Sequence, residues 1–346
     1  MQSKIFLVGT FVLLLLVSCS HKGNQQNNNE ETSGSMPAKV EPVNVGNETQ
    51  LLLDDLKANG DYVNSRNFPS LIKAQSVYDE LNKNNLIIDI RSNNEFIGGH
   101  IKDAVHKDFS ELPDYFVSDI KPFEYQRIVI VSADGQEAAY TTCLLRLMGY
   151  GNVYALRWGM SSWDEQNAQE GWFKGISSDF RKQIETKENI AKPGTVMPEL
   201  GTGKSTGEEI GTARFMKLFE DGLNDVMIHA SDVFANPSNY YVINYDRKDK
   251  YLDGHIPGAV RYKPGATLSF VDEMASIPAN KPVVVYCGTG HNSAFVTAYL
   301  RLFGYDAHTL AYGNNSFMYG QMVEHRSTLS WLPFTHEEVH NFEVVK

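Results

Sequence analysis

Residues 283–305 read VVVYCGTGHNSAFVTAYLRLFGY, and residues 128–150 read IVIVSADGQEAAYTTCLLRLMGY. Each stretch begins with a short β-branched run, turns through a glycine, and continues as an amphipathic run that ends at Gly-Tyr. Buried parallel strands are short, apolar and β-branched, and a glycine commonly ends a helix. The pattern therefore predicts strands over 127–131 and 283–286, each followed by a loop and a helix.

The likeness extends upstream at a constant offset. Residues 87–105, IIDIRSNNEFIGGHIKDAV, align with residues 242–260, VINYDRKDKYLDGHIPGAV, and His255 follows His100 by 155 positions, the same offset as between the first two stretches. A fixed offset over this length indicates an internal duplication. Because strands alternate with helices in each copy, the sequence predicts an α/β fold of two tandem units, each a central parallel sheet with helices on both faces.

The N-terminus has the features of an export signal. Lys4 precedes an apolar run over 5–17, which is shorter than the ~20 residues of a membrane span. The run leads into Leu-Val-Ser-Cys at 16–19, which resembles a bacterial lipobox and makes Cys19 the expected site of lipidation, with palmitate among the lipids. An ordinary cleaved signal peptide with a chance cysteine is the alternative. The protein is therefore expected to be exported and lipid-anchored to the cell envelope, at the outer membrane, on its periplasmic face or at the surface.

Composition gives the expected division of the chain. The segment after Cys19 is rich in Asn and Gln and poor in large apolar residues, so it cannot build a core. The expected parts are a signal peptide over 1–18, a disordered tether over 19–66, a first unit over 67–172, a linker over 173–212 and a second unit over 213–346.

Charge limits the partners of the 346-residue chain. The formal net charge of -11 at pH 7 argues against nucleic acid, because phosphate binding requires a basic face. It also means that an anionic substrate must be held by local groups. No set of His, Cys and acidic residues has metal-ligand spacing, so no metal is expected.

Cys287 stands where a strand leads into a helix. The backbone N–H groups and the helix dipole at such a junction favour an anion, and Gly288 and Gly290 allow the loop to curve tightly. A reactive thiol with a pKa below the ordinary ~8.5 is therefore expected. A buried cysteine packed behind the strand is the alternative.

The other positions of interest in the duplication have structural interpretations. Ser132 takes the place of Cys287 in the first copy, so the first copy lacks the thiol. Cys143 falls in the middle of a predicted helix, where the second copy has Ala298, so it is expected in the core.

These motifs resemble the rhodanese family in its tandem-domain form. The likeness rests on Asp-Ile-Arg at 89–91 with Glu-Phe at 95–96, on the Gly-His-Ile turns that begin at Gly99 and Gly254, and on the Cys-x-x-Gly-x-x-Ser loop over 287–293. The resemblance implies transfer of a sulfane sulfur through a cysteine persulfide, with no cofactor. It also implies an inactive first copy and a catalytic second copy.

The resemblance and the loop together give an expected site. Cys287 is the catalytic residue, and the expected substrate-binding residues are Arg247, Arg261, Gly288, Thr289, Gly290, His291, Asn292 and Ser293. The loop contains no arginine, and its Cys-Gly-Thr-Gly start is similar to that of mercaptopyruvate sulfurtransferases. A donor less highly charged than thiosulfate is therefore expected. His291 is either a partial cation in the site or an exposed loop residue.

The predicted function is that of a sulfurtransferase. It would move sulfur from a small donor of the thiosulfate or 3-mercaptopyruvate type to a thiol or cyanide-like acceptor. The alternative is a non-catalytic or redox-sensing binding module at the cell envelope. A cysteine phosphatase is excluded, because those enzymes clamp phosphate with an arginine six residues after the cysteine, where this chain has Ser293.

Overall fold

The computed structural model describes residues 46–191, 194, 196–268 and 271–346. These residues form two five-stranded sheets, and all strand pairs in both are parallel. In spatial order the first sheet consists of β1 (Leu71–Ile72), β5 (Val153–Leu156), β4 (Arg127–Val131), β2 (Asn85–Asp89) and β3 (Val105–His106). The second consists of β6 (Met227–Ile228), β10 (Ala307–Leu310), β9 (Val283–Tyr286), β7 (Tyr241–Asn244) and β8 (Val260–Arg261). The two sheets have the same strand order, which confirms the predicted tandem α/β fold.

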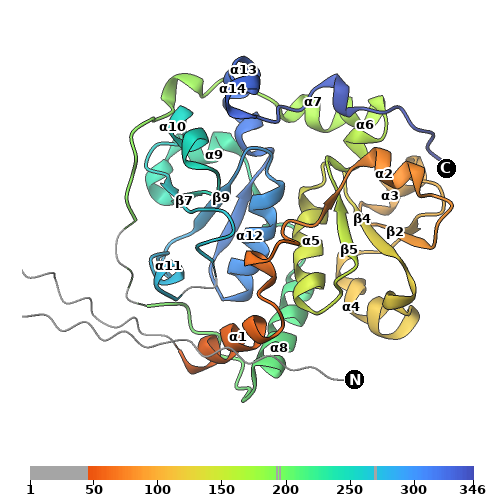
Figure 1. Cartoon of the computed structure of the whole chain (residues 1–346), viewed down its shortest axis with the longest axis horizontal. Helices are drawn as coiled ribbons and strands as arrows, with labels where there is room; N and C mark the ends of the chain where they lie inside the picture. Colours follow the sequence, from red (N-terminus) through yellow and green to blue (C-terminus); the bar gives the residue numbers. More distant parts are fainter. Residues whose placement is uncertain (1–45, 192–193, 195, 269–270) are drawn as a thin grey trace, which may run out of the picture. The chain divides into compact units, whose positions relative to one another are not determined.

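Helices cover both faces of each sheet (Figure 1). In the first half of the chain they are α1 (Asn47–Ala58), α2 (Ala74–Asp79), α3 (Asn93–Gly98), α4 (Leu112–Asp114), α5 (Gln136–Leu147), α6 (Glu165–Glu170) and α7 (Trp172–Gly175). In the second half they are α8 (Gly207–Asp221), α9 (Ala230–Ala235), α10 (Lys248–Asp253), α11 (Val271–Ala275), α12 (His291–Leu302), α13 (Tyr319–Glu324) and α14 (Arg326–Leu329). Within the described residues, none of these helices has the length and apolar content of a membrane span.

Alternation along the strands distributes their side chains between two cores. In β2, Ile88 faces the large core that contains α5 and α12, whereas Ile87 faces a smaller core with Val77 of α2. The second sheet does the same, with Val285 in the large core and Val284 in a core with Val233 of α9. Because α5 and α12 pack against each other, one core joins the two copies.

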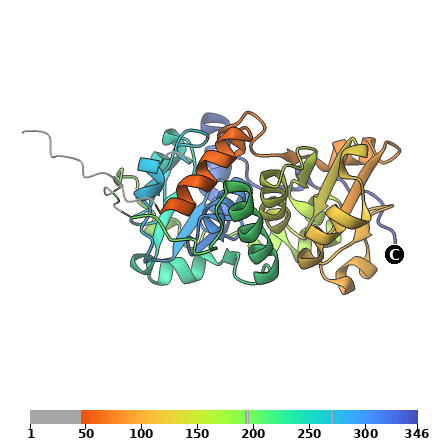
Figure 2. The same ribbon diagram turned by 90° about the horizontal axis from the view of Figure 1, so that it is seen from below.

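The predicted tether over 19–66 is wrong from residue 47 onward. There α1 forms, and its side chains Leu52, Leu53 and Leu56 are buried in the large core, where α1 packs on α8 (Figure 2). Leucines at this spacing lie on one helix face, so this segment can bury apolar surface that the residues before it lack. The expected signal peptide and Cys19 lie outside the described residues.

The boundaries of the linker and of the second unit also differ from the expectation. The expected linker over 173–212 includes the start of α8, where the Thr206 hydroxyl accepts the N–H of Glu209 and caps the helix. The C-terminal segment leaves the second unit and crosses to the first (Figure 1). There Phe342 stacks on Tyr78 with 4.0 Å between ring centroids, and Val345 pairs with His100.

Candidate functional site

The Cys287 loop joins the carboxyl end of β9 to α12. Gly290 precedes the helix with a φ of 76°, in the left-handed region that glycine adopts without strain. The N–H of Asn314 donates to the carbonyl of Cys287 over 3.0 Å, and the Asn315 amide donates to the carbonyl of Gly288 over 2.9 Å. These bonds fix two carbonyls of the loop on the turn that follows β10.

Cys287 is only 3% exposed, and the Ser293 hydroxyl lies 3.8 Å from its sulfur. Burial and, second, the negative charge of Asp246 raise the pKa of the Cys287 thiol. The backbone N–H groups of Ser293 and Thr289 act in the opposite direction but do not outweigh them. The expected lowered pKa is therefore wrong, because the sequence showed the favourable loop but neither the depth of burial nor the neighbouring carboxyl group.

A cavity of about 250 Å³ opens beside Cys287. Both copies contribute to it: the first supplies Leu71, Ile72, Lys73 and Arg157, and the second supplies Asp246, Lys250, Cys287, Gly288, Thr289, Asn292 and Leu332. Three cationic side chains, Lys73, Arg157 and Lys250, thus line the same cavity as one buried thiol, in a protein of net negative charge. They are the local groups that an anionic substrate requires.

Three of the eight expected substrate-binding residues line this cavity, namely Gly288, Thr289 and Asn292. The structure places the other five elsewhere. Arg247 is exposed and pairs with Asp249 over 2.6 Å, and Arg261 reaches the backbone carbonyl of Asp246 over 3.4 Å. Gly290 and Ser293 shape the loop from behind, where the Ser293 hydroxyl donates to the Gly290 carbonyl over 2.9 Å.

His291, the fifth, is fully buried and points to the other copy. Its Nε2 accepts the backbone N–H of Trp158 over 3.1 Å, and its ring stacks on Trp172. Burial lowers the pKa of His291 to about 3, so the ring is neutral, and neither expectation for it holds. With Nε2 accepting, Nδ1 carries the proton and donates to the Thr289 hydroxyl over 3.1 Å, which leaves that hydroxyl's own hydrogen free for a ligand.

Gln136 makes the reciprocal contact from the first copy, at the position that matches His291. Its Oε1 accepts the N–H of Tyr312 over 2.7 Å, and its Nε2 donates to the carbonyl of Leu310 over 3.1 Å. Each loop therefore anchors the turn that follows the last strand of the other copy. Ser132 takes part in this scaffold, because its buried hydroxyl accepts the N–H groups of Gly135 and Ala138.

Replacing His291 with alanine should destabilise the protein by about 2–4 kcal/mol, because it leaves the buried N–H of Trp158 without an acceptor and empties the space of the ring. Urea unfolding measures the change. His291→Gln should recover part of the loss, since glutamine fills the matching place in the first copy. His336→Ala, which removes an exposed ring, is the control. A loss no larger than in the control would show that His291 does not join the copies.

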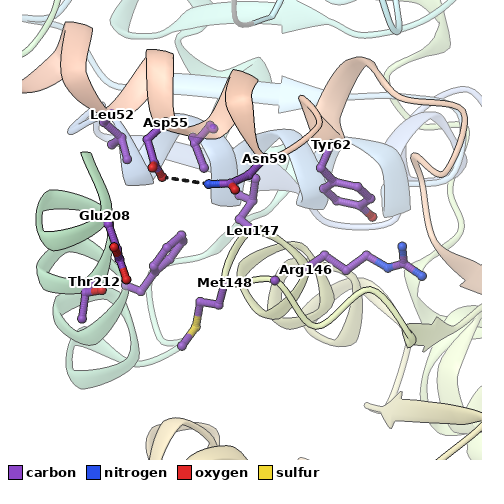
Figure 3. Close-up of a pocket in the computed structure, with 13 residues that line it drawn as sticks. Leu52, Asp55, Asn59, Tyr62, Arg146, Leu147, Met148, Glu208 and Thr212 are labelled. Carbon is purple, nitrogen blue, oxygen red and sulfur yellow. Dashed lines mark hydrogen bonds between the residues drawn. The ribbon is translucent and has the colours of Figure 1, made fainter. Parts of the chain in front are cut away.

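A second cavity, of about 660 Å³, lies between α1, α8 and the end of α5 (Figure 3). It shares no lining residue with the Cys287 cavity. The guanidinium of Arg146 points away from Asp55 and Glu208 in Figure 3. Arg146 instead donates from Nε to the carbonyl of Val153 over 2.6 Å.

The fold and the site define a two-copy α/β protein with one cysteine loop, in the second copy, that faces a cavity shared by both. The model of the rhodanese-like domain matches the chain twice, over residues 73–166 and 234–318, which is just over half of its length. The chain belongs to the rhodanese-like family and carries two of its domains in tandem.

Individual relatives match at low identity. The tRNA uridine(34) hydroxylase of Prochlorococcus marinus is 28% identical over 142 residues, which are 39% of this chain and 43% of that protein. This chain thus spans less than half of the hydroxylase. A thiosulfate sulfurtransferase structure from Pseudomonas aeruginosa is 18% identical, with 76% of this chain and 48% of that chain covered and a TM-score of 0.29. The structure of a rhodanese-like domain protein from Staphylococcus aureus is 22% identical, with 26% of this chain and 87% of that chain covered and a TM-score of 0.24.

Proposed function

We propose that the protein is a sulfurtransferase in which Cys287 carries the sulfur as a persulfide. The observation that supports this most directly is the cavity at Cys287, which Lys73, Arg157 and Lys250 line together with the thiol. Donors such as thiosulfate and 3-mercaptopyruvate are small anions, and these cations can hold them beside the sulfur. In this proposal the first copy supplies the cations Lys73 and Arg157, and the second copy supplies the thiol that reacts.

The transfer takes place in two displacements at sulfur. The Cys287 thiolate attacks the sulfane sulfur of the donor; the new S–S bond forms as the donor's S–S or C–S bond breaks, and sulfite or the pyruvate enolate leaves with the electron pair. An acceptor thiolate or cyanide then attacks the outer sulfur, and Cys287 leaves as the thiolate. The N–H groups of Thr289 and Ser293, which act to lower the Cys287 pKa, would stabilise the anionic sulfur at each stage.

The absence of arginine in the loop is a weaker guide to the donor than the sequence indicated. Lys73 and Arg157 come from the first copy and Lys250 from α10, so the site can hold a more highly charged donor than the loop alone. We therefore include donors of both the thiosulfate and the 3-mercaptopyruvate type.

Mass spectrometry of the intact protein tests the proposal. Incubation with thiosulfate or 3-mercaptopyruvate should add one sulfur atom, and peptide mapping should place it on Cys287. A non-catalytic or redox-sensing binding module is the second candidate, favoured by the burial of Cys287 and its raised pKa. No added sulfur with either donor would support this candidate instead.

We also propose that lipid on Cys19 anchors the protein to the cell envelope. Cys19→Ala should move nearly all of the protein from the membrane fraction to the soluble fraction, because the lipid would supply the membrane affinity. Membrane fractionation with a high-salt wash, followed by immunoblotting, measures how the protein distributes between the two fractions. Ser20→Ala is the control. A Cys19→Ala protein that stays in the washed membranes would show that another part of the chain anchors it.

A further inference from the structure

Asp246 is a charged group at the Cys287 cavity that the proposed transfer does not use. It follows β7, is only 9% exposed and lines the cavity. Its Oδ2 is buried and has no hydrogen-bond partner among the described residues. A buried carboxyl oxygen in this state is costly, so it is a strong candidate for contact with a ligand.

Lys250 does not satisfy the Asp246 carboxyl group. The Lys250 Nζ lies 3.9 Å from Oδ1, beyond hydrogen-bond distance, and is placed over the ring of Trp331, 4.7 Å from its centroid. Burial raises the pKa of Asp246 despite Lys250 and the N–H groups of Arg247 and Gly288. The raised pKa agrees with a carboxyl group that the protein itself leaves incompletely compensated.

Arg157 presents the complementary feature from the first copy. Its Nη2 is buried without a hydrogen-bond partner among the described residues, and its guanidinium lies over the ring of Trp158, 4.7 Å from its centroid. No ion pair joins Arg157 to Asp246. One cavity of about 250 Å³ is therefore lined by an acidic and a basic side chain that each keep one atom, Asp246 Oδ2 and Arg157 Nη2, without a hydrogen-bond partner among the described residues.

We infer that the sulfur acceptor is a small zwitterionic thiol of the α-amino acid type, whose carboxylate binds Arg157 and whose ammonium binds Asp246. This inference rests on the proposed function and adds the substrate class for its second step. Thiosulfate and 3-mercaptopyruvate carry no positively charged donor for Asp246, whereas such an acceptor offers a partner to both Asp246 Oδ2 and Arg157 Nη2 at once. Its thiol attacks the outer sulfur of the Cys287 persulfide, the bond from that sulfur to Cys287 breaks, and the thiol proton ends on Cys287.

The test compares L-cysteine with 3-mercaptopropionate, which keeps the thiol and the carboxylate but lacks the amine. Persulfide-loaded protein is mixed with each thiol, and kcat/KM is measured for the wild type, Asp246→Asn and Asp249→Asn. Asp249 is the matched control, because it lies on α10 and pairs with Arg247 but does not line the cavity. The intrinsic reactivities of the two thiols cancel when their ratio is compared between variants.

In Asp246→Asn the cysteine to mercaptopropionate ratio should fall about tenfold or more, as expected for the loss of a charge-assisted hydrogen bond. In Asp249→Asn it should stay as in the wild type. An unchanged ratio in Asp246→Asn, with the variant shown to be folded by circular dichroism, would overturn the inference while leaving the proposed transfer intact.

A binding measurement decides the inference even if Cys287 forms no persulfide. Calorimetry with S-methyl-L-cysteine and 3-(methylthio)propionate should show tighter binding of the zwitterion to the wild type, and Asp246→Asn should lose that preference. Equal binding of the two compounds by the wild type would overturn the inference. Failure to load sulfur, with the binding preference present, would instead overturn only the proposed function.

Discussion

Replacing Cys287 with serine is expected to abolish sulfur transfer, with a loss of at least about 1000-fold in kcat/KM. A hydroxyl is a far weaker nucleophile than a thiolate and cannot carry a second sulfur as a persulfide. The fold should persist, because serine is close in size to cysteine and the Ser293 hydroxyl lies near its position. Transfer from thiosulfate to cyanide, followed as thiocyanate, measures the loss.

Two variants serve as controls for Cys287→Ser. Cys143→Ala removes the other cysteine of the described chain, which is fully buried in the large core. Ser132→Ala removes the hydroxyl at the matching place in the first copy. Both should cost stability but leave transfer by the folded protein nearly intact. If Ser132→Ala lost sulfur transfer at unchanged stability, the assignment of the active loop to the second copy would be wrong.

The fold could be predicted because each strand and helix signal lies within a short stretch of sequence. The apolar run over 127–131 forms β4 with the same bounds. Gly149, with a φ of 102°, lies just after the end of α5 at Leu147. The duplication then required the two sheets to match. The error at α1 arose because Leu52 and Leu53 become part of a core only through α8, which lies far away in the sequence.

The site was less predictable, because the packing of one copy on the other determines it. Arg157 lies 130 positions before Cys287 in the sequence, and Ala311, which follows β10 as Arg157 follows β5, has no charge. No pattern within one copy therefore marks it. His291 shows the converse case: its place in the loop suggested a substrate contact, but the first copy provides Trp158 and Trp172 to bury it. Within the second copy, the loop pattern did point to Gly288, Thr289 and Asn292, which line the cavity.

Gly313→Ala is expected to destabilise the protein by about 2–4 kcal/mol and to disrupt the Cys287 loop. Gly313 has a φ of 53°, and a Cβ atom there would overlap the carbonyl oxygen of Cys287 and lie 2.5 Å from the nitrogen of Gly290. These neighbours are backbone atoms of a loop that Asn314 and Asn315 hold in place, so the loop must move. Sulfur transfer should fall at least about tenfold even where the protein is folded. Urea unfolding and thiocyanate formation measure the two effects.

Two glycines separate the causes of the Gly313→Ala effect. At Gly258, with a φ of 74° and no atom within 4 Å of an added Cβ, alanine adds backbone strain alone, so the loss of stability should be smaller and transfer unchanged. At Gly159 an added Cβ would overlap the Ser132 carbonyl and lie 2.5 Å from the nitrogen of Gly135, which is the same clash in the copy without the thiol. Gly159→Ala should therefore lose stability as Gly313→Ala does but keep more of the transfer. Equal loss of transfer in both variants would mean that the two loops move together, and that the contacts of Gln136 and His291 couple them more tightly than the separate clashes require.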